Sequence, residues 1–326
     1  LFLLTLGWTL AQTPYYAWGA ELEEGYAART RVTAWRETMV LGGTLLATIL
    51  YFLGGEGGEG LRVVALVVIA MIPVTVIAAV LGAGERAHLP VRPLSVAEGA
   101  RAMAENRPFR RLLVAWFVNG AANGLPVTLF VFFVEFRLGA ADQAGLMLLL
   151  YFLAAIGGVP FWTWLARRIS KHRAWAVAMV WASLIFAGAL FLGEGDIVPF
   201  AIISVLTGLA LGADLALPPS IQADVVELDT RRTGAARAGL FFAIWQVATK
   251  AALALSSGLA LIALDGAGFS AEGGNDAGAL WALALLYAAA PIVLKLGAVA
   301  LMWRFPLDRA ALEEIRSETP AAAQPG

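Results

Sequence analysis

The chain of 326 residues contains no cysteine. It therefore has no disulfide framework, no cysteine-ligated zinc site and no thiol chemistry. Histidine is nearly absent as well, since only His88 and His172 occur, and we place both in charged loops. We expect no metal site, because imidazole is the nitrogen ligand that most such sites need. The net charge of −1 gives no indication of a nucleic-acid partner.

Several short catalytic motifs are also missing. The chain has no G-x-x-x-x-G-K-[ST] loop, which argues against an ATP-driven motor in this chain. It has no G-x-S-x-G or H-E-x-x-H sequence, so hydrolase chemistry lacks support. A membrane-embedded enzyme acting on lipids would need clustered acids or histidines at one interface. Because His88 and His172 lie in separate predicted loops, we expect a protein that is not an enzyme.

Charge is scarce and apolar residues are abundant. Charged residues make up 14 % of the chain and hydrophobic residues 60 %, with a mean hydropathy of +0.76; soluble domains carry about 25 % charge. A helix needs about 20 apolar residues to cross the hydrocarbon core. The sequence therefore predicts an all-α, polytopic membrane protein with nine spans. The nine candidates are residues 1–20, 37–54, 62–83, 111–134, 143–165, 174–192, 197–217, 239–264 and 278–303.

Lysine and arginine gather on one side of the predicted membrane. The loops after the odd-numbered spans hold nineteen of them, and the opposite loops hold only Arg62 and Arg137. The nineteen are Arg29, Arg31, Arg36, Arg86, Arg92, Arg101, Arg107, Arg110, Arg111, Arg167, Arg168, Lys171, Arg173, Arg231, Arg232, Arg237, Arg304, Arg309 and Arg316. Because positive loops stay in the cytoplasm, we expect a cytoplasmic C-terminus and an outer location for Leu1.

A long polar loop divides the chain into two groups of spans. We expect residues 1–83 to form the remainder of an N-terminal helical bundle with three spans, and residues 84–110 to form a cytoplasmic inter-bundle loop. We expect residues 111–304 to form a C-terminal six-helix bundle and residues 305–326 a cytoplasmic tail. Since Leu1 lies inside an apolar run, we also expect the chain to be a piece of a longer protein.

Lys250 and Asp214 are charged residues deep inside predicted spans. Lys250 lies near the middle of span 239–264, where a lysine costs about 2.5–3.5 kcal/mol. It either lines a polar cavity and binds a solute oxygen, or forms a structural ion pair with an acid on another helix. Asp214 is a candidate proton or cation carrier, or a partner of Lys250. Its alternative is a helix-end residue that reaches water beside Pro218 and Pro219.

Other polar side chains also lie at membrane depth. We expect Lys295 to pair within the bundle for a structural reason. Four amides are candidate solute contacts or interhelical hydrogen-bond partners, and Tyr16 could stack on a sugar face or simply pack. The amides are Gln12, Asn119, Asn123 and Gln246.

Two segments carry a family resemblance. The first runs from Pro14 to Leu22 (PYYAWGAEL) and continues through Tyr26 to Arg36; the second runs from Gln222 (QADVVELDT) through Trp245 to Lys250. Together they resemble the glycoside–pentoside–hexuronide:cation symporters, the melibiose-permease branch of the major facilitator superfamily. The resemblance implies a fold of major-facilitator-type helical bundles, in which the nine spans are helices 4–12 of twelve.

The resemblance also implies roles for individual residues. Arg36 matches an arginine that contacts the sugar, and Lys250 matches a lysine close to the sugar and cation sites. Gln12 stands where melibiose permease has an aspartate that couples sugar to cation, and an amide cannot take up a proton or neutralise Na⁺. We expect Asp214 to carry the coupling cation instead. The implied inner gate or latch consists of Arg29, Arg31, Asp224, Glu227, Arg231 and Arg237.

The resemblance thus implies a secondary active transporter that carries a sugar or similar organic solute together with H⁺ or Na⁺, without a further cofactor. We expect a monomer in the inner membrane of a bacterium, in contact with the lipid bilayer. Related branches carry lysolipids, so an amphiphilic solute is one alternative. A truncated membrane protein without transport activity is the other.

Overall fold

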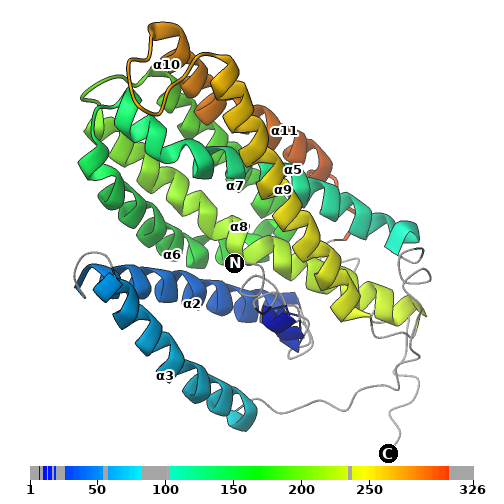
Figure 1. Cartoon of the computed structure of the whole chain (residues 1–326). Helices are drawn as coiled ribbons and strands as arrows, with labels where there is room; N and C mark the ends of the chain where they lie inside the picture. Colours follow the sequence, from blue (N-terminus) through cyan, green and yellow to red (C-terminus); the bar gives the residue numbers. More distant parts are fainter. Residues whose placement is uncertain are drawn as a thin grey trace, which may run out of the picture.

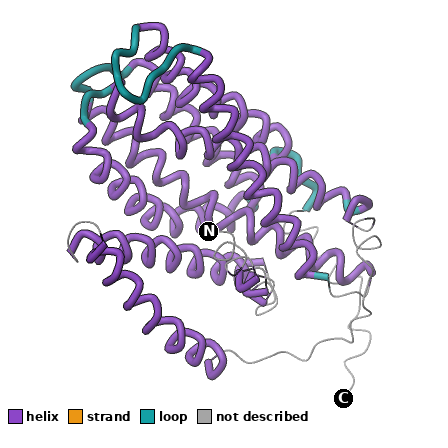
Figure 2. Tube along the Cα trace, viewed as in Figure 1, coloured by secondary structure: helices purple, strands orange, loops and turns teal. Residues whose placement is uncertain are grey.

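The structure is a computed structural model that describes residues 7, 10–12, 14–16, 18, 19, 26–53, 58–82, 101, 103–233 and 237–307. The regular elements within these residues are helices, with no strand among them (Figure 2). The α-helices are α2 Tyr26–Leu53, α3 Gly58–Gly82, α5 Arg107–Phe132, α6 Ala144–Ile169, α7 Lys171–Phe186, α8 Ile197–Thr233, α9 Ala238–Gly266, α10 Ala277–Ala284 and α11 Ala290–Met302. Short π or 3₁₀ segments are η1 Phe133–Arg137, η2 Ala141–Gln143, η3 Ala187–Phe191 and η4 Leu285–Ala289.

The prediction of an all-α, polytopic membrane protein is confirmed. Within the described residues, seven helical segments are long and apolar enough to cross a membrane. They correspond to the predicted spans from 62–83 onwards. Predicted span 37–54 lies in α2, which is helical but is not one of the seven, and most of span 1–20 lies outside the described residues.

Two predicted boundaries are wrong. Helix α8 does not end at residue 217 but continues through Pro218 and Pro219 to Thr233. Prolines are tolerated inside membrane helices because packed neighbours compensate for the lost backbone hydrogen bonds, and α2, α6 and α7 all pack on α8. The predicted charged loop between spans 143–165 and 174–192 is also shorter than expected. Only Ser170, with φ 85°, separates α6 from α7.

This short connection changes the surroundings of two residues. Lys171 and His172 open α7 and are buried, rather than lying in an exposed charged loop. Lys171 is satisfied there because its ammonium pairs with Asp224 of α8 at 2.5 Å. The ring of His172 lies near that of Phe305, with centroids 6.0 Å apart. His88 lies outside the described residues.

Helices α5 to α11 pack into one bundle, and α2 lies along it (Figure 1). Helix α2 contacts α6 and α8, whereas α3 packs against α2 and leaves its apolar side chains exposed. The most extensive helix contact among the described residues is between α6 and α8, where glycines permit it. A Cβ on Gly212 would lie 2.6 Å from the Ala155 carbonyl oxygen, and Gly158 and Gly208 are packed still more tightly, against the backbone of Leu209 and of Tyr151. Small residues at such seams let membrane helices approach closely.

The proposed division at residues 83, 110 and 304 stays a prediction. Residues 83–100 and 308–326 lie outside the described part of the chain. Helix α5 begins inside the predicted inter-bundle loop, at Arg107, because Asn106 caps it. The Asn106 side chain accepts a hydrogen bond from the Phe109 amide at 3.0 Å, and Pro108 follows at the start of the helix, where its missing N–H is not needed.

Candidate functional site

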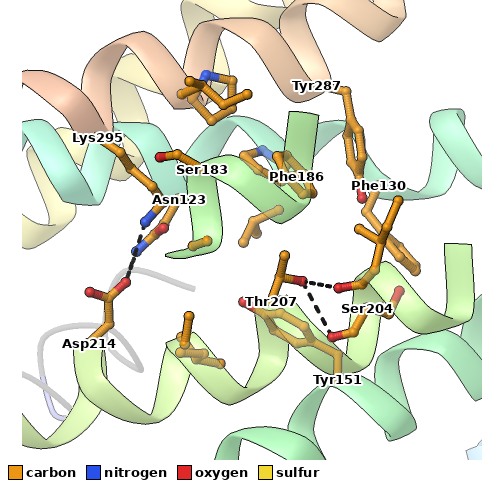
Figure 3. Close-up of a pocket in the computed structure, with 18 of the residues that line it drawn as sticks. Asn123, Phe130, Tyr151, Ser183, Phe186, Ser204, Thr207, Asp214, Tyr287 and Lys295 are labelled. Atoms are coloured by element: carbon orange, nitrogen blue, oxygen red, sulfur yellow. Dashed lines mark hydrogen bonds and ion pairs between the residues drawn. The ribbon is translucent and has the colours of Figure 1, made fainter. Parts of the chain in front are cut away.

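The C-terminal bundle contains a partly open cavity of about 450 Å³. Its wall is mostly apolar and aromatic, with a few polar groups, and comes from α5, α6, α7, α8 and the η4–α11 segment. Figure 3 shows Asp214, Asn123 and Lys295 together on one side of the cavity and Phe130, Tyr151 and Tyr287 across from them. The cavity therefore has an apolar body and a polar end.

Local irregularities in the helices help to shape the wall. Pro291 removes the helix hydrogen bond that the Tyr287 carbonyl would accept, and the preceding turn is the π-helical η4. The Tyr287 ring is stacked on Phe133, with centroids 4.2 Å apart. Pro218 stands four residues after Asp214 and removes the corresponding bond from the Asp214 carbonyl.

Asp214 is the centre of the polar end. It lies in the middle of α8 with 7 % of its surface exposed, so it is not a helix-end residue that reaches water. Trp175 Nε1 donates to its Oδ1 at 2.5 Å, and Asn123 Nδ2 donates to its Oδ2 at 3.0 Å. Lys295 Nζ forms an ion pair with its Oδ2 at 3.6 Å. The buried carboxylate is thus held by two hydrogen-bond donors and one cation.

Lys295 links Asp214 to a second amide. Its ammonium donates to Asn119 Oδ1 at 2.9 Å. Asn119 and Asn123 are four residues apart on α5, so their side chains share one helix face. The structure therefore brings together three predicted site residues, Asn119, Asn123 and Asp214. The ion pair between Lys295 and Asp214 agrees with the pairing that the sequence predicted for Lys295.

Two other predicted residues of this half of the chain lie apart from the cluster. The cation that pairs with Asp214 is Lys295 of α11, not Lys250, so the suggested pair of Asp214 with Lys250 is wrong. Lys250 is exposed on α9, and Gln246, one turn earlier, is buried. Neither lines the cavity. Trp175 was not identified from the sequence, because a tryptophan among apolar residues gives no sign that its indole N–H meets a buried carboxylate.

A second polar cluster lies where the N-terminal residues meet α2. The guanidinium of Arg36 lies 3.9 Å from the centroid of the Tyr16 ring and forms an ion pair with Glu37 at 2.9 Å. The side chains of Gln12 and Glu37 lie close to the Tyr16 hydroxyl. Its ring also lies 6.3 Å from that of Phe242 on α9. Three predicted solute-contact residues, Gln12, Tyr16 and Arg36, therefore lie together and face the C-terminal bundle.

The predicted latch residues make pairs within the C-terminal bundle. Asp224 pairs with Lys171, and Glu227 pairs with Arg231 at 2.9 Å. Arg237 contacts both carboxylate oxygens of Asp229, at 2.6 and 2.8 Å. Arg31 is exposed on α2, and the side chain of Arg29 lies outside the described residues. The latch role itself stays a prediction.

Comparison with known proteins supplies a family and a fold. Residues 1–309 match the family described as MFS/sugar transport protein. A sodium-dependent lysophosphatidylcholine symporter of Danio rerio is 27 % identical over 221 residues, which are 66 % of this chain and 41 % of that protein. The Homo sapiens sodium-dependent lysophosphatidylcholine symporter is 27 % identical over 236 residues, 71 % of this chain and 42 % of that protein. The chain thus spans about two fifths of the length of these relatives.

The solved structures support the same architecture. The fucose:proton symporter of E. coli superimposes with a TM-score of 0.61 at 14 % identity, over 88 % of this chain and 73 % of that one. At this identity the likeness concerns the fold alone. The major-facilitator fold expected from the sequence is confirmed, whereas the narrower glycoside–pentoside–hexuronide branch is not, because these curated relatives are lysolipid symporters.

Proposed function

This chain belongs to the MFS/sugar transport protein family, and we propose that the full-length protein is a cation-coupled symporter that works by alternating access. The solute that we propose is a single-chain amphiphile resembling a lysophospholipid, rather than a sugar. The coupling cation is Na⁺ or H⁺, and no further cofactor takes part. In such carriers two helical bundles rock around a site near the middle of the membrane.

The observation that carries this proposal is the cavity with an apolar body and a charged end. A sugar presents hydroxyl groups on nearly all sides, and each buried hydroxyl needs a hydrogen-bond partner. The cavity wall offers such partners only in part, since the Ser183 and Thr207 hydroxyls already donate to backbone carbonyls of their own helices. An alkyl chain needs no hydrogen-bond partner. The names of the relatives support the same class of solute.

The roles of individual residues are part of the proposal. We assign Asp214 the coupling cation, and we assign Arg36, Lys250 and Tyr16 contacts with the solute on its way between the bundles. Amides at membrane depth supply further donors and acceptors. They are Gln12, Asn119, Asn123 and Gln246. The charges expected to latch the inner gate are Arg29, Arg31, Asp224, Glu227, Arg231 and Arg237.

The placement in the membrane follows from the distribution of lysine and arginine. We propose a monomer in the cell membrane. We place its C-terminus in the cytoplasm, because nineteen positive residues lie on one side of the predicted spans. Residues 1–83 would belong to one bundle and residues 111–304 to the other, joined by residues 84–110.

Transport by the full-length protein in liposomes tests the proposal. We expect accumulation of labelled lysophosphatidylcholine when a Na⁺ or pH gradient is imposed, and none with both gradients collapsed. Labelled melibiose serves as the sugar. If melibiose were taken up and lysophosphatidylcholine were not, the solute would be a sugar and not an amphiphile. Uptake of neither would favour a membrane protein without transport activity.

A further inference from the structure

We propose that Lys295, held in place by Asn119, forms an oxyanion-binding subsite at the polar end of the cavity. It takes the phosphate or carboxylate group of a single-chain amphiphile whose alkyl chain fills the apolar body. This inference rests on the proposed function, because it names the chemistry that selects the solute. It adds Lys295, which lines the cavity, to Lys250, which the family resemblance implied, as a second cation that contacts the solute.

The ammonium of Lys295 has donor capacity to spare. Of its three N–H donors, one is directed at Asn119 Oδ1, 2.9 Å away. Its distance of 3.6 Å to Asp214 Oδ2 exceeds the roughly 2.7–2.9 Å of a charge-assisted hydrogen bond. Lys295 also lines the cavity. A ligand oxygen could therefore accept a hydrogen bond from this ammonium without displacing Asn119.

Asn119 positions the ammonium from within the packed bundle. Its side chain is fully buried and is not among those that line the cavity, and its Nδ2 has no hydrogen-bond partner among the described residues. The orientation of the amide is fixed, because the reverse orientation would direct its NH₂ group at the Lys295 ammonium. Asn119 is therefore a positioning residue, and Lys295 is the residue that contacts the ligand oxygen.

Asp214 keeps its own partners when a ligand binds. Its two oxygens accept hydrogen bonds from Trp175 and Asn123, so it does not depend on Lys295 alone. Its charge nevertheless repels an anion bound next to it. A cation that neutralises Asp214 would therefore strengthen anion binding, and the anion would strengthen cation binding by the same factor. The subsite thus gives a physical route to coupling.

The apolar body has the size and shape for a chain. Its volume of about 450 Å³ is about three times that of a ~150 Å³ apolar cavity that holds benzene. Phe130 and Tyr287 lie on the far side, with the Phe200 ring 6.2 and 6.4 Å from theirs, and the charged side chains Asp214 and Lys295 lie at the other end (Figure 3). A ligand with one charged end and one alkyl chain matches this division.

Binding measurements on the full-length protein in nanodiscs test the subsite. The three probes share one C16 chain: palmitoyl lysophosphatidylcholine, palmitate and monopalmitoylglycerol. We expect Lys295→Gln to weaken the first two by about 10–100-fold, the value of a hydrogen bond to a charged group, and to leave the neutral glyceride within about threefold. Arg62→Gln removes an exposed charge on α3 and should change none of the three.

Lys295→Gln leaves Asp214 without its cation, which by itself can misfold the protein. A second pair of variants separates this effect from the loss of ligand binding. Asp214→Asn and Asp214→Asn/Lys295→Gln both lack the carboxylate, so their difference isolates Lys295. An unchanged preference in the double variant for the two probes with an oxyanion group over the glyceride would overturn the subsite while leaving the amphiphile carrier intact. Failure of all three probes to bind the unaltered protein would overturn the proposed function itself. Weakening of lysophosphatidylcholine alone identifies phosphate as the ligand group, and weakening of palmitate alone identifies carboxylate.

Discussion

Lys171 and Asp224 face each other at 2.5 Å with side chains only 1 % and 3 % exposed. Removing one member of such a pair leaves a buried charge uncompensated, which typically costs 3–5 kcal/mol. We expect Lys171→Met to destabilise the protein by about this amount, which chemical unfolding in detergent would measure.

Two comparisons make this prediction specific. Lys171→Met/Asp224→Leu removes both charges and should recover most of the lost stability, since apolar replacement of a buried pair is often neutral. Arg101→Met breaks an exposed pair with Glu105 and should cost less than about 1 kcal/mol. If Lys171→Met were as mild as Arg101→Met, the pair would contribute little to the fold.

The sequence located the polar end only in part. Asn119, Asn123 and Asp214 could be identified because polar residues at membrane depth are rare and stand out. Their partners could not, because the spans are apolar all round and carry no periodicity that tells which face meets a neighbour. This is why Lys250 was expected beside Asp214, although α11 and not α9 presents the lysine that pairs with it.

The contact between α6 and α8 is a property of whole elements. Gly208 faces the backbone of Tyr151, and Gly212 faces that of Ala155. An added methyl group at Gly208 would meet a carbonyl oxygen, which cannot move aside as a flexible side chain could. We expect Gly208→Ala to destabilise the protein by about 1–3 kcal/mol, the usual cost of overpacking.

Thermal unfolding of the purified variants checks this. Gly258→Ala on α9 is the matched control, since nothing lies within 4 Å of the added methyl group. Alanine also favours the helix by up to about 1 kcal/mol over glycine, so this control should be neutral or slightly stabilised. Equal melting temperatures for the two variants would argue against close packing of α6 on α8.

The sequence predicted which segments form membrane helices, but it did not predict where each helix ends. Apolar runs of membrane length identified each of the seven segments that can cross a membrane in the described residues. The end of α8 was misplaced because Pro218 and Pro219 ordinarily terminate a helix. The sequence could not show that α2, α6 and α7 would pack around these prolines and allow the helix to continue.

At the scale of the whole molecule, the contact between α2 and the C-terminal bundle includes a group of small side chains, two of which are polar. The Thr30 and Ser220 hydroxyls hydrogen-bond at 2.9 Å, and Ala34 packs with Val159 and Ala216 one turn away. Small side chains form few contacts that must be broken when helices separate. This surface therefore suits two bodies that part and rejoin during alternating access.

A reversible cross-link at this surface provides a direct test of that motion. These 326 residues contain no cysteine, so in this part of the protein Thr30→Cys/Ser220→Cys has only the introduced pair. Because the two hydroxyl oxygens are already within hydrogen-bonding distance, the sulfur atoms can reach the ~2.05 Å of a disulfide after a small adjustment. We expect oxidation to stop most uptake and a reductant to restore it.

The control is Trp35→Cys/Ser220→Cys, whose α2 cysteine lies on the exposed side of the helix. It should not form the cross-link, and oxidation should leave its uptake unchanged. Full uptake by the cross-linked Thr30→Cys/Ser220→Cys protein would show that α2 and α8 stay together throughout the cycle. The moving surface would then lie elsewhere, and the cavity in the C-terminal bundle would have to open without separation of α2 from α8.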